Sequence, residues 1–576
     1  MSMQKMHLRA KLARGDAPTA LVLKNAKVIN VFNGKITQDD IAIDGGKIIG
    51  IGNYTGEREI DLEGKFVAPG LIDAHMHMES TLVAPDQMAR IIVPRGTTTV
   101  IADPHEIANV AGLAGIRYMI EASEKTALNG FFMMPSCVPA TPFENSGAVL
   151  TRDSLAELID HKMVLGLGEV MNYVGVINGD QDMIEKMELA NHMIIDGHGP
   201  EISGKSLNAY VINGIRTEHE CTTVAEMEER IGLGMYIAIR EGSAARNLDT
   251  LIQGVNTHTK HLCMFCTDDK HPEDILREGH IDYNVRRAIE LGMDPITALQ
   301  LATINPARCY NLRDIGAIAP GYDADLIILD DLNSFNIVQV YKKGSLVADH
   351  KKALFDSQKV DPSSVMNTVK IKSVTPEQFR IKLNSDLVNV IHMTPESIVT
   401  NRAVRRVYLD LDGYFTPNKL LDVVKIAVIE RHGNTHNIGL GLIENFNLKN
   451  GAIATTIAHD SHNIIVIGDS DSDMAVAVNE LIRVQGGITI AQNGAIKATL
   501  ELPIAGLMST DSMENVSEKL SELRKIAYES LQISNKVDPF MTLSFMALPV
   551  IPELKITDQG YFDVTSFDWI GIEVEG

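Results

Sequence analysis

Eight short apolar runs, spread through residues 69–312, are the feature of this chain that most limits its fold. Stretches with helical spacing of apolar residues, such as 153–161 and 182–192, lie between them. The interiors of the runs are mostly apolar, as in strands buried on both faces. Eight strand–helix units in about 250 residues predict a TIM (β/α)8 barrel. The runs are LIDAH (71–75), TTTVIAD (97–103), GFFMMPS (130–136), MVLGLGE (163–169), HMIIDGH (192–198), NGIRTEH (213–219), MYIAIRE (235–241) and HLCMFCTDD (261–269).

The segments that flank these runs predict two further domains. Short β-like stretches separated by turn signals occupy about 19–67 and return near 315–350. We expect them to form a small antiparallel sheet and a β-sandwich domain built from both flanks. The last 200 or so residues mix helical and strand patterns and are long enough for a separate α+β domain. The predicted boundaries are 1–68 with 313–358 for the sandwich, 69–312 for the barrel and 359–576 for the C-terminal domain.

Charge and composition limit the partners. The chain has 576 residues and a formal net charge of −23, which argues against nucleic-acid and anionic membrane surfaces but not against a single nucleobase. Five cysteines do not make a disulfide framework, and Cys263 and Cys266 read as small core residues of one strand. The N-terminus lacks an apolar signal core, and no window holds 18 uninterrupted apolar residues. We therefore expect a cytoplasmic protein.

Polar residues gather where the apolar runs end, and in a TIM barrel those ends line one mouth. His75 and His77 would share one face of the first strand, because side chains at i and i+2 of a strand point the same way. Imidazole and carboxylate suit transition metals, and the absence of a thiolate favours an open catalytic site over a closed structural one. Six such side chains could hold two divalent ions if one carboxylate bridged them. The predicted ligands are His75, His77, Glu169, His198, His219 and Asp268.

Several motifs carry a family resemblance. The stretch PGLIDAHMHMES (69–80) resembles the first-strand signature of the amidohydrolase superfamily, and residues 303–330 resemble its return into the small sandwich domain. Within that superfamily the chain is similar over its whole length to the bacterial adenine deaminase family. The motifs that narrow the resemblance are ADPHEIANV (102–110), GLGEVMN (166–172), DGHGP (196–200), TEHECTT (217–223) and TDDKHPEDILREGHID (267–282).

The resemblance implies hydrolytic deamination of adenine to hypoxanthine and ammonia, as in purine salvage, by a hydroxide held at a binuclear site. It suggests Mn(II) or Fe(II), while the ligand types also accept Zn(II). It implies that Asp268 is both metal ligand and proton shuttle, although Asp269 is an adjacent alternative. We also expect a homo-oligomer, a dimer or larger.

The resemblance also implies that the substrate meets residues of the second strand end, DPHE. We assign Glu106 to proton transfer or ring recognition, because a glutamic acid can hydrogen-bond ring nitrogens and donate to N1 or N7. Asp103 and His105 are further candidates for substrate binding, with a capped turn at Pro104 as the alternative. Ser136 and Arg240 are candidates on their strand-end position alone.

The sequence differs from two related families, and these differences bear on the alternative functions. The fourth run offers Glu169 where cyclic-amide hydrolases of this superfamily usually carry a carboxylated lysine. The cytidine deaminase signature, His-x-Glu with Pro-Cys-x-x-Cys, is absent. An enzyme acting on another aminated heterocycle or a cyclic amide remains the first alternative. A non-catalytic barrel scaffold is the second.

A second polar cluster lies in IAHDSHNIIVIGDSDSD (457–473). We interpret it as a polar loop between strands, followed by a helix that an Asp caps. A second metal site containing His459 and His462 is one alternative. A loop that covers the barrel mouth, in its own or a neighbouring subunit, is another.

Overall fold

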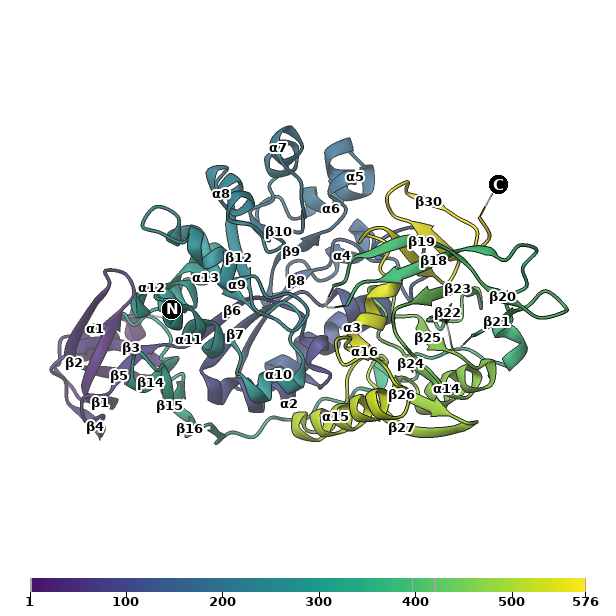
Figure 1. Cartoon of the computed structure of the whole chain (residues 1–576). Helices are drawn as coiled ribbons and strands as arrows, with labels where there is room; N and C mark the ends of the chain where they lie inside the picture. The colour runs from purple at the N-terminus through teal and green to yellow at the C-terminus, as the bar shows by residue number, and fades with distance from the viewer. Residues whose placement is uncertain (1–2, 396, 419–420, 575–576) are drawn as a thin grey trace.

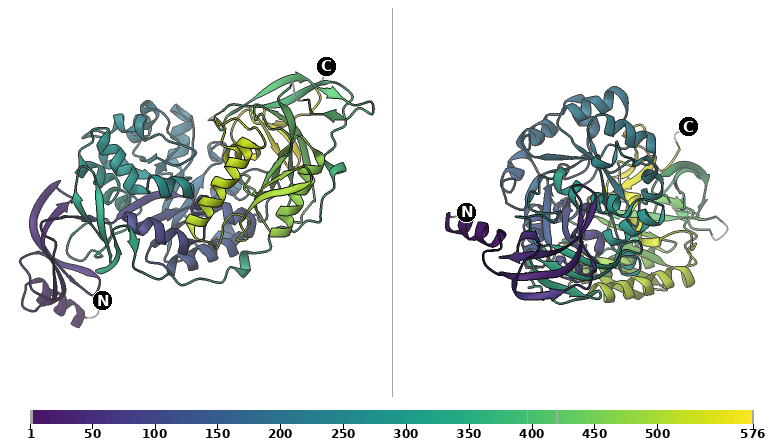
Figure 2. Two further views of the ribbon diagram at one scale, coloured as in Figure 1. Left: turned by 60° about the horizontal axis from the view of Figure 1, so that its bottom comes forward. Right: turned by 90° about the vertical axis from the view of Figure 1, so that its left-hand side faces the viewer.

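The computed structural model describes residues 3–395, 397–418 and 421–574. The predicted barrel stands in the middle of the molecule (Figure 1), with the N-terminal sheet on one side and the C-terminal domain on the other. The left view of Figure 2 shows the same order, and the right view looks at the molecule from the side of the N-terminal sheet.

The barrel contains all eight predicted strands in chain order. Strands β6 to β10 form one parallel sheet and β11 to β13 another. Backbone hydrogen bonds close the ring, from Asp268 N to His75 O (3.0 Å) on one side and from Arg216 N to Ile195 O (3.0 Å) on the other. The predicted TIM barrel is therefore confirmed. Its strands are β6 (Leu71–Met76), β7 (Thr97–Ala102), β8 (Asn129–Met134), β9 (Val164–Val170), β10 (Ile194–Gly197), β11 (Thr217–Glu218), β12 (Tyr236–Arg240) and β13 (Cys263–Cys266).

Several helices between these strands begin at polar caps. Thr223 and Glu226 form a reciprocal capping box at the start of α8. Asp180 caps α6, which spans Gln181–Leu189 and overlaps the predicted helical stretch of 182–192. The predicted helix over 153–161 is wrong in length, because α4 ends at Ala156 and turns follow. The barrel helices are α2 (Pro85–Ile92), α3 (His105–Glu124), α4 (Arg152–Ala156), α5 (Tyr173–Asn178), α6, α7 (Gly204–Ile212), α8 (Val224–Gly232), α9 (Leu248–Leu251), α10 (Pro272–Arg277), α11 (Ile281–Glu290), α12 (Pro295–Leu301) and α13 (Ile304–Cys309).

The two flanking segments share one sheet, as predicted, after a short N-terminal helix, α1 (Met3–Ala13). The sheet is mixed rather than antiparallel, because β4 and β5 run parallel to β1. It curls so that Ile48 N donates to Tyr322 O across 2.9 Å, which encloses an apolar core between its ends. The strands are β1 (Thr19–Asn30), β2 (Lys35–Asp44), β3 (Lys47–Gly52), β4 (Gly56–Asp61), β5 (Phe66–Pro69), β14 (Leu326–Asp331), β15 (Asn336–Lys342), β16 (Ser345–Asp349) and β17 (Lys352–Ala353).

The C-terminal domain is built on an eight-stranded sheet with the order β19-β18-β23-β22-β25-β24-β26-β27. Residues of β22 alternate between its faces: Ala427 and Ile429 pack with helix α14, and Ile426 joins the core shared with the barrel. The strands are β18 (Leu387–Met393), β19 (Thr400–Arg406), β22 (Val423–Ile429), β23 (Ile438–Glu444), β24 (Ala452–Thr455), β25 (Ile464–Gly468), β26 (Gly487–Gln492) and β27 (Ala495–Glu501). The helices are α14 (Asp471–Val484), α15 (Met513–Glu529) and α16 (Pro539–Ser544). Two small sheets add β20 (Tyr408–Leu409) with β21 (Phe415–Thr416), and β28 (Leu554–Thr557) with β29 (Gly560–Asp563) and β30 (Asp568–Trp569).

One continuous apolar core joins the barrel helices to the inner face of the C-terminal sheet. The barrel and the C-terminal domain therefore share a buried apolar interface and are not independent units joined by a linker. The predicted boundaries at 68/69, 312/313 and 358/359 stay predictions. In the described ranges, no helix is long and apolar enough to cross a membrane. Cys263 and Cys266 are buried in β13 and belong to different apolar clusters, as expected for opposite faces of one strand.

Candidate metal centre

The two histidines of the first strand end lie close together and deep in the barrel mouth. His75 is 2% exposed and His77 4% exposed. Their ring centroids are 5.1 Å apart, at an interplanar angle of 85°. The Nδ1 atom of His77 lies 3.0 Å from the carbonyl oxygen of Asp103. A proton held on Nδ1 by that carbonyl leaves Nε2 free to act as a ligand.

One carboxylate oxygen of Glu169 faces both of these histidines. Its Oε1 lies 2.9 Å from Nε2 of His75 and 2.9 Å from Nε2 of His77. Asp268 Oδ1 lies 3.4 Å and 3.1 Å from the same two nitrogen atoms. His75 Nε2 and Glu169 Oε1 are buried without a hydrogen-bond partner, an arrangement that a cation between them would satisfy. These four side chains therefore form one candidate ion position.

The other oxygen of Glu169 faces a second pair of histidines. Its Oε2 lies 2.9 Å from Nδ1 of His198 and 3.8 Å from Nε2 of His219. The rings of His198 and His219 are 5.2 Å apart, and His219 stacks on His75 at 4.3 Å. Glu169 thus belongs to two neighbouring ligand groups. The structure brings all six predicted ligands together around a carboxylate that can bridge.

Electrostatics keep the two carboxylates of this cluster anionic. Burial raises the pKa of Glu169, but the charges of His77 and His219 outweigh it and hold that pKa well below its usual range. The pKa of Asp268 is likewise held low, since the hydrogen bonds of His75 and His77 oppose the effect of burial. Anionic oxygen donors beside imidazoles are the donor set that a transition metal prefers.

Two candidates for substrate binding instead hold the backbone of Glu169. The Oδ2 atom of Asp103 accepts a hydrogen bond from Glu169 N at 2.8 Å, and the hydroxyl of Ser136 donates to Glu169 O. A Cβ at Gly168 would lie 2.0 Å from Asp103 Oδ2, so glycine is needed for this close approach. Asp103 and Ser136 therefore orient Glu169. Their contact with substrate stays a prediction.

Arg240 is engaged by two carboxylates. Its Nη1 lies 3.1 Å from Asp268 Oδ2, and its Nη2 donates to Glu220 Oε2 at 3.0 Å. Glu220 Oε1 also lies 3.5 Å from His219 Nε2. Our sequence reasoning missed Glu220, although it directly follows the predicted ligand His219 at the end of the sixth barrel strand. Arg240 can orient Asp268, and its predicted contact with substrate is untested.

Glu106 and His105 lie at the start of α3, where they meet the C-terminal domain. Glu106 Oε1 lies 3.1 Å from His459 Nδ1, and His105 Nε2 lies 3.9 Å from Asp460 Oδ1. The ring of His105 also touches that of His77, with centroids 4.6 Å apart. Glu106 is 2% exposed and His459 is 8% exposed. Side chains of the same chain's C-terminal domain therefore complete the barrel mouth.

This result corrects our interpretation of the second polar cluster. A loop between β24 and β25 followed by a helix is confirmed, but Ser470 rather than an Asp caps α14. The loop is buried over the barrel mouth instead of being an ordinary polar connection. This is the alternative of a loop that covers the mouth of its own subunit. The sequence could not decide in its favour, because the packing of the two domains brings the loop to Glu106. Glu106, His459 and His462 also lie close enough together to form a potential cation site.

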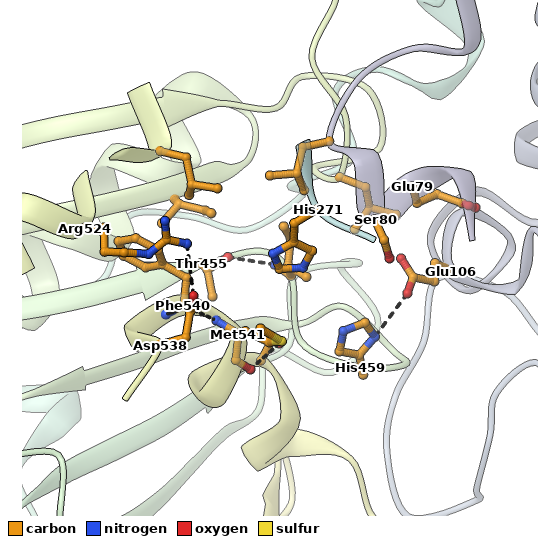
Figure 3. Close-up of a pocket in the computed structure, with 16 residues that line it drawn as sticks. Glu79, Ser80, Glu106, His271, Thr455, His459, Arg524, Asp538, Phe540 and Met541 are labelled. Carbon is orange, nitrogen blue, oxygen red and sulfur yellow. Dashed lines mark hydrogen bonds and ion pairs between the residues drawn. The ribbon is translucent and has the colours of Figure 1, made fainter. Parts of the chain in front are cut away.

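A pocket opens between the barrel mouth and the C-terminal domain (Figure 3). Ser80 and Glu106 form its barrel wall, with His459 beside them. Thr455, Phe540 and Met541 line the opposite side. The lining is mixed: Ile488, Leu507 and Phe540 are apolar, whereas Glu106 on one side and the ion pair of Arg524 with Asp538 on the other are charged.

Comparison with known proteins gives the class of protein first. Residues 66–347 match the model of the amidohydrolase family, which covers the barrel, strands β5, β14 and β15 of the flanking sheet, and the start of β16. That family implies binding of a divalent metal ion, and the ligand groups described above fit one. The predicted fold class is therefore confirmed.

Similar proteins identify the family within this class. Residues 397–568 match the adenine deaminase C-terminal domain. The chain is 52% identical to the adenine deaminase of Clostridium acetobutylicum, over 97% of this chain and 98% of the relative. It is 49% identical to that of Nitratidesulfovibrio vulgaris strain Hildenborough, over 98% of each chain. This chain belongs to the adenine deaminase family, as its motifs predicted.

Proposed function

We propose that the protein hydrolyses adenine to hypoxanthine and ammonia at a binuclear metal site in the barrel mouth. The observation that carries this proposal is the division of the Glu169 carboxylate between two histidine pairs, His75 with His77 and His198 with His219. The names of the full-length relatives supply the substrate. We assign the ligand set to His75, His77, Glu169, His198, His219 and Asp268. Divalent ions bound there would lower the pKa of a water molecule towards about 7.

The reaction requires two proton transfers from the attacking water. Its oxygen bonds to C6, one of its protons reaches N1, and the other leaves with the exocyclic nitrogen as ammonia. We assign the transfer to the leaving nitrogen to Asp268, whose Oδ1 faces the ligand histidines. We assign the proton at N1 to Glu106, whose carboxylate lines the pocket. The departing amine would otherwise leave as a poorly stable amide ion.

The low pKa of Glu106 refines its expected role. Burial raises that pKa, but the charge and hydrogen bond of His459 outweigh it and keep the side chain ionised. We therefore expect Glu106 to accept a proton or an N–H hydrogen bond first and donate afterwards. A permanently protonated glutamic acid, one of our sequence-based options, is not favoured.

The experiment that tests this function uses purified full-length protein stripped of metal by a chelator. It is reloaded with Mn(II), Fe(II) or Zn(II), and ammonia release and the ultraviolet shift from adenine to hypoxanthine are recorded. We expect turnover of adenine, two ions per chain and the highest rates with Mn(II) or Fe(II). A panel of other aminated purines, pyrimidines and cyclic amides tests the first alternative.

Turnover of another substrate but not of adenine would overturn the assignment of substrate. No turnover of any heterocycle with any metal would favour the non-catalytic scaffold. Homo-oligomer formation and a cytoplasmic location stay predictions.

A further inference from the structure

The loop of residues 457–463 carries a histidine into the barrel mouth from the C-terminal domain. His459 Nδ1 lies 3.1 Å from Glu106 Oε1, and Figure 3 shows this pair at one end of the pocket. The other oxygen of Glu106 lies 3.9 Å from His462 Nε2. Both oxygens of this carboxylate therefore face the C-terminal domain. None of the six proposed metal ligands takes part in these contacts.

The imidazole of His459 is held in place by its own domain. Its ring stacks on Phe545 with a centroid distance of 4.5 Å and an interplanar angle of 25°. Its backbone N–H donates to Ser544 O at 3.1 Å. The ring of His462 meets it edge-on at 5.5 Å. Contacts on the ring and on the backbone leave His459 little rotational freedom.

The rest of the loop is fixed by a buried arginine and by the barrel. The Nη2 atom of Arg431 donates to Ala505 O at 2.9 Å, and its Nε donates to His462 O. His432 Nε2 lies 2.9 Å from Ser461 O. Asn463 Nδ2 donates to Asn145 O of the barrel at 2.8 Å, which ties the two domains together at this point. The loop is therefore preorganised rather than an open flap.

Glu106 depends on this histidine for more than a hydrogen bond. It stands in the first turn of α3, 2% exposed, near the second buried carboxylate of Glu79. A buried carboxylate beside another acid is costly unless a cation pairs with it. His459, whose pKa burial lowers but Glu106 raises to a net value of about 9, supplies that cation.

We propose that His459 is a positioning residue for the deamination reaction, holding the Glu106 carboxylate at the edge of the pocket between the barrel mouth and the C-terminal domain. This inference rests on the proposed function and deepens it. It makes the C-terminal domain a required part of the active site, because the barrel contributes Glu106 and the other domain contributes the group that orients it. Glu106 meets the substrate, and His459 acts through Glu106.

The test compares His459→Ala, His459→Asn and His459→Gln in the metal-loaded, full-length protein. Asn places an amide N–H close to the position of Nδ1, whereas the amide of Gln lies one methylene group further out. We expect His459→Ala and His459→Gln to lower kcat about 100-fold, with KM within about threefold and metal content unchanged. We expect the kcat of His459→Asn to be at least about tenfold higher than that of His459→Ala.

A double-mutant cycle separates positioning from an independent role. If His459 acts through Glu106, adding His459→Ala to the Glu106→Gln variant should lower kcat by less than about threefold. The matched control is His392→Ala, which removes a histidine paired with Glu444 inside the same domain. We expect that control to keep kcat within about twofold of wild type.

Three results would overturn the role of His459. They are an unchanged kcat in His459→Ala, a loss of bound metal that matches the loss of rate, and fully multiplicative effects with Glu106→Gln. If His459→Ala does not fold, equal rates for the Asn and Gln variants would overturn it as well. Wild-type protein that releases no ammonia from adenine rejects the proposed function and this inference with it. Active wild type with an unaffected His459→Ala rejects only the inference.

Discussion

Asp268 and Asp269 are neighbours in the chain, but their carboxylates serve different partners. Asp268 Oδ1 lies 3.1 Å from His77 Nε2, whereas Asp269 accepts a hydrogen bond from the hydroxyl of Ser80. Strand β13 ends at Cys266, and Asp268 has a left-handed backbone with a φ of 56°. This turn, more than simple strand alternation, aims Asp268 at the ligand histidines.

Substituting each aspartate separately tests which one carries the chemistry. We expect Asp268→Asn to lower kcat at least about 1,000-fold, because it removes a metal ligand and a proton carrier together. Asp269→Asn should lower kcat by less than about tenfold, since the amide oxygen can still accept a hydrogen bond from the Ser80 hydroxyl. Steady-state adenine kinetics on metal-loaded proteins give both numbers. Equal losses would mean that our choice of Asp268 is wrong.

The bridging role of Glu169 is tested by counting ions. Glu169→Gln keeps the shape of the side chain but removes the charge that faces both histidine pairs. We expect bound metal to fall from two ions per chain to one or fewer, and the rate to fall more than about 100-fold. Metal analysis after dialysis gives the content. The control is Glu241→Gln, whose carboxylate faces Arg246 at 3.4 Å. Two retained ions and a full rate in Glu169→Gln would refute the bridge.

The sequence predicted the barrel and the convergence of its ligands because both follow from local pattern. Apolar runs give strands, and the ends of parallel strands must meet at one mouth. His75 and Glu169 could therefore be placed together without knowing any packing. Their distances and the division of the Glu169 oxygens between two groups required the structure.

Residues chosen by strand-end position alone were less predictable. Ser136 and Arg240 lie at the mouth as expected, but their polar atoms are taken up by the backbone of Glu169 and by Glu220. The pairing of His459 with Glu106 depends on how the C-terminal sheet packs on the barrel. No local pattern contains that information, because it is a property of an interface between distant segments.

A substitution at Arg240 distinguishes between two roles, orienting Asp268 and contacting the substrate. If it orients Asp268 through the contact at 3.1 Å, Arg240→Lys should lower kcat about tenfold and leave KM within about threefold. Lysine keeps the charge but cannot reproduce the planar fork that meets Glu220 and Asp268 together. Initial rates over a range of adenine concentrations separate the two constants. A raised KM with unchanged kcat would instead support the substrate contact predicted from the sequence.

A buried acid at the domain interface links stability to pH. Glu144 is 5% exposed, and burial together with the charge of Asp460 raises its pKa from 4.5 to about 8. Between those two pH values the folded protein binds more protons at this site than the unfolded chain. The contribution of Glu144 to unfolding free energy therefore falls as pH rises from about 5 to 8, by at most about 1.4 kcal/mol per pH unit.

Glu144→Gln should remove this dependence, because the amide carries no charge at any of these pH values. We expect the thermal midpoint of the variant to exceed that of wild type at pH 8 and to approach it near pH 5. Differential scanning calorimetry of the metal-loaded proteins at several pH values measures the difference. Glu157→Gln is the matched control, since that carboxylate is exposed and pairs with Arg117 on the surface. A gap between Glu144→Gln and wild type that stays constant from pH 5 to pH 8 would show that the Glu144 carboxyl is not protonated in the folded protein.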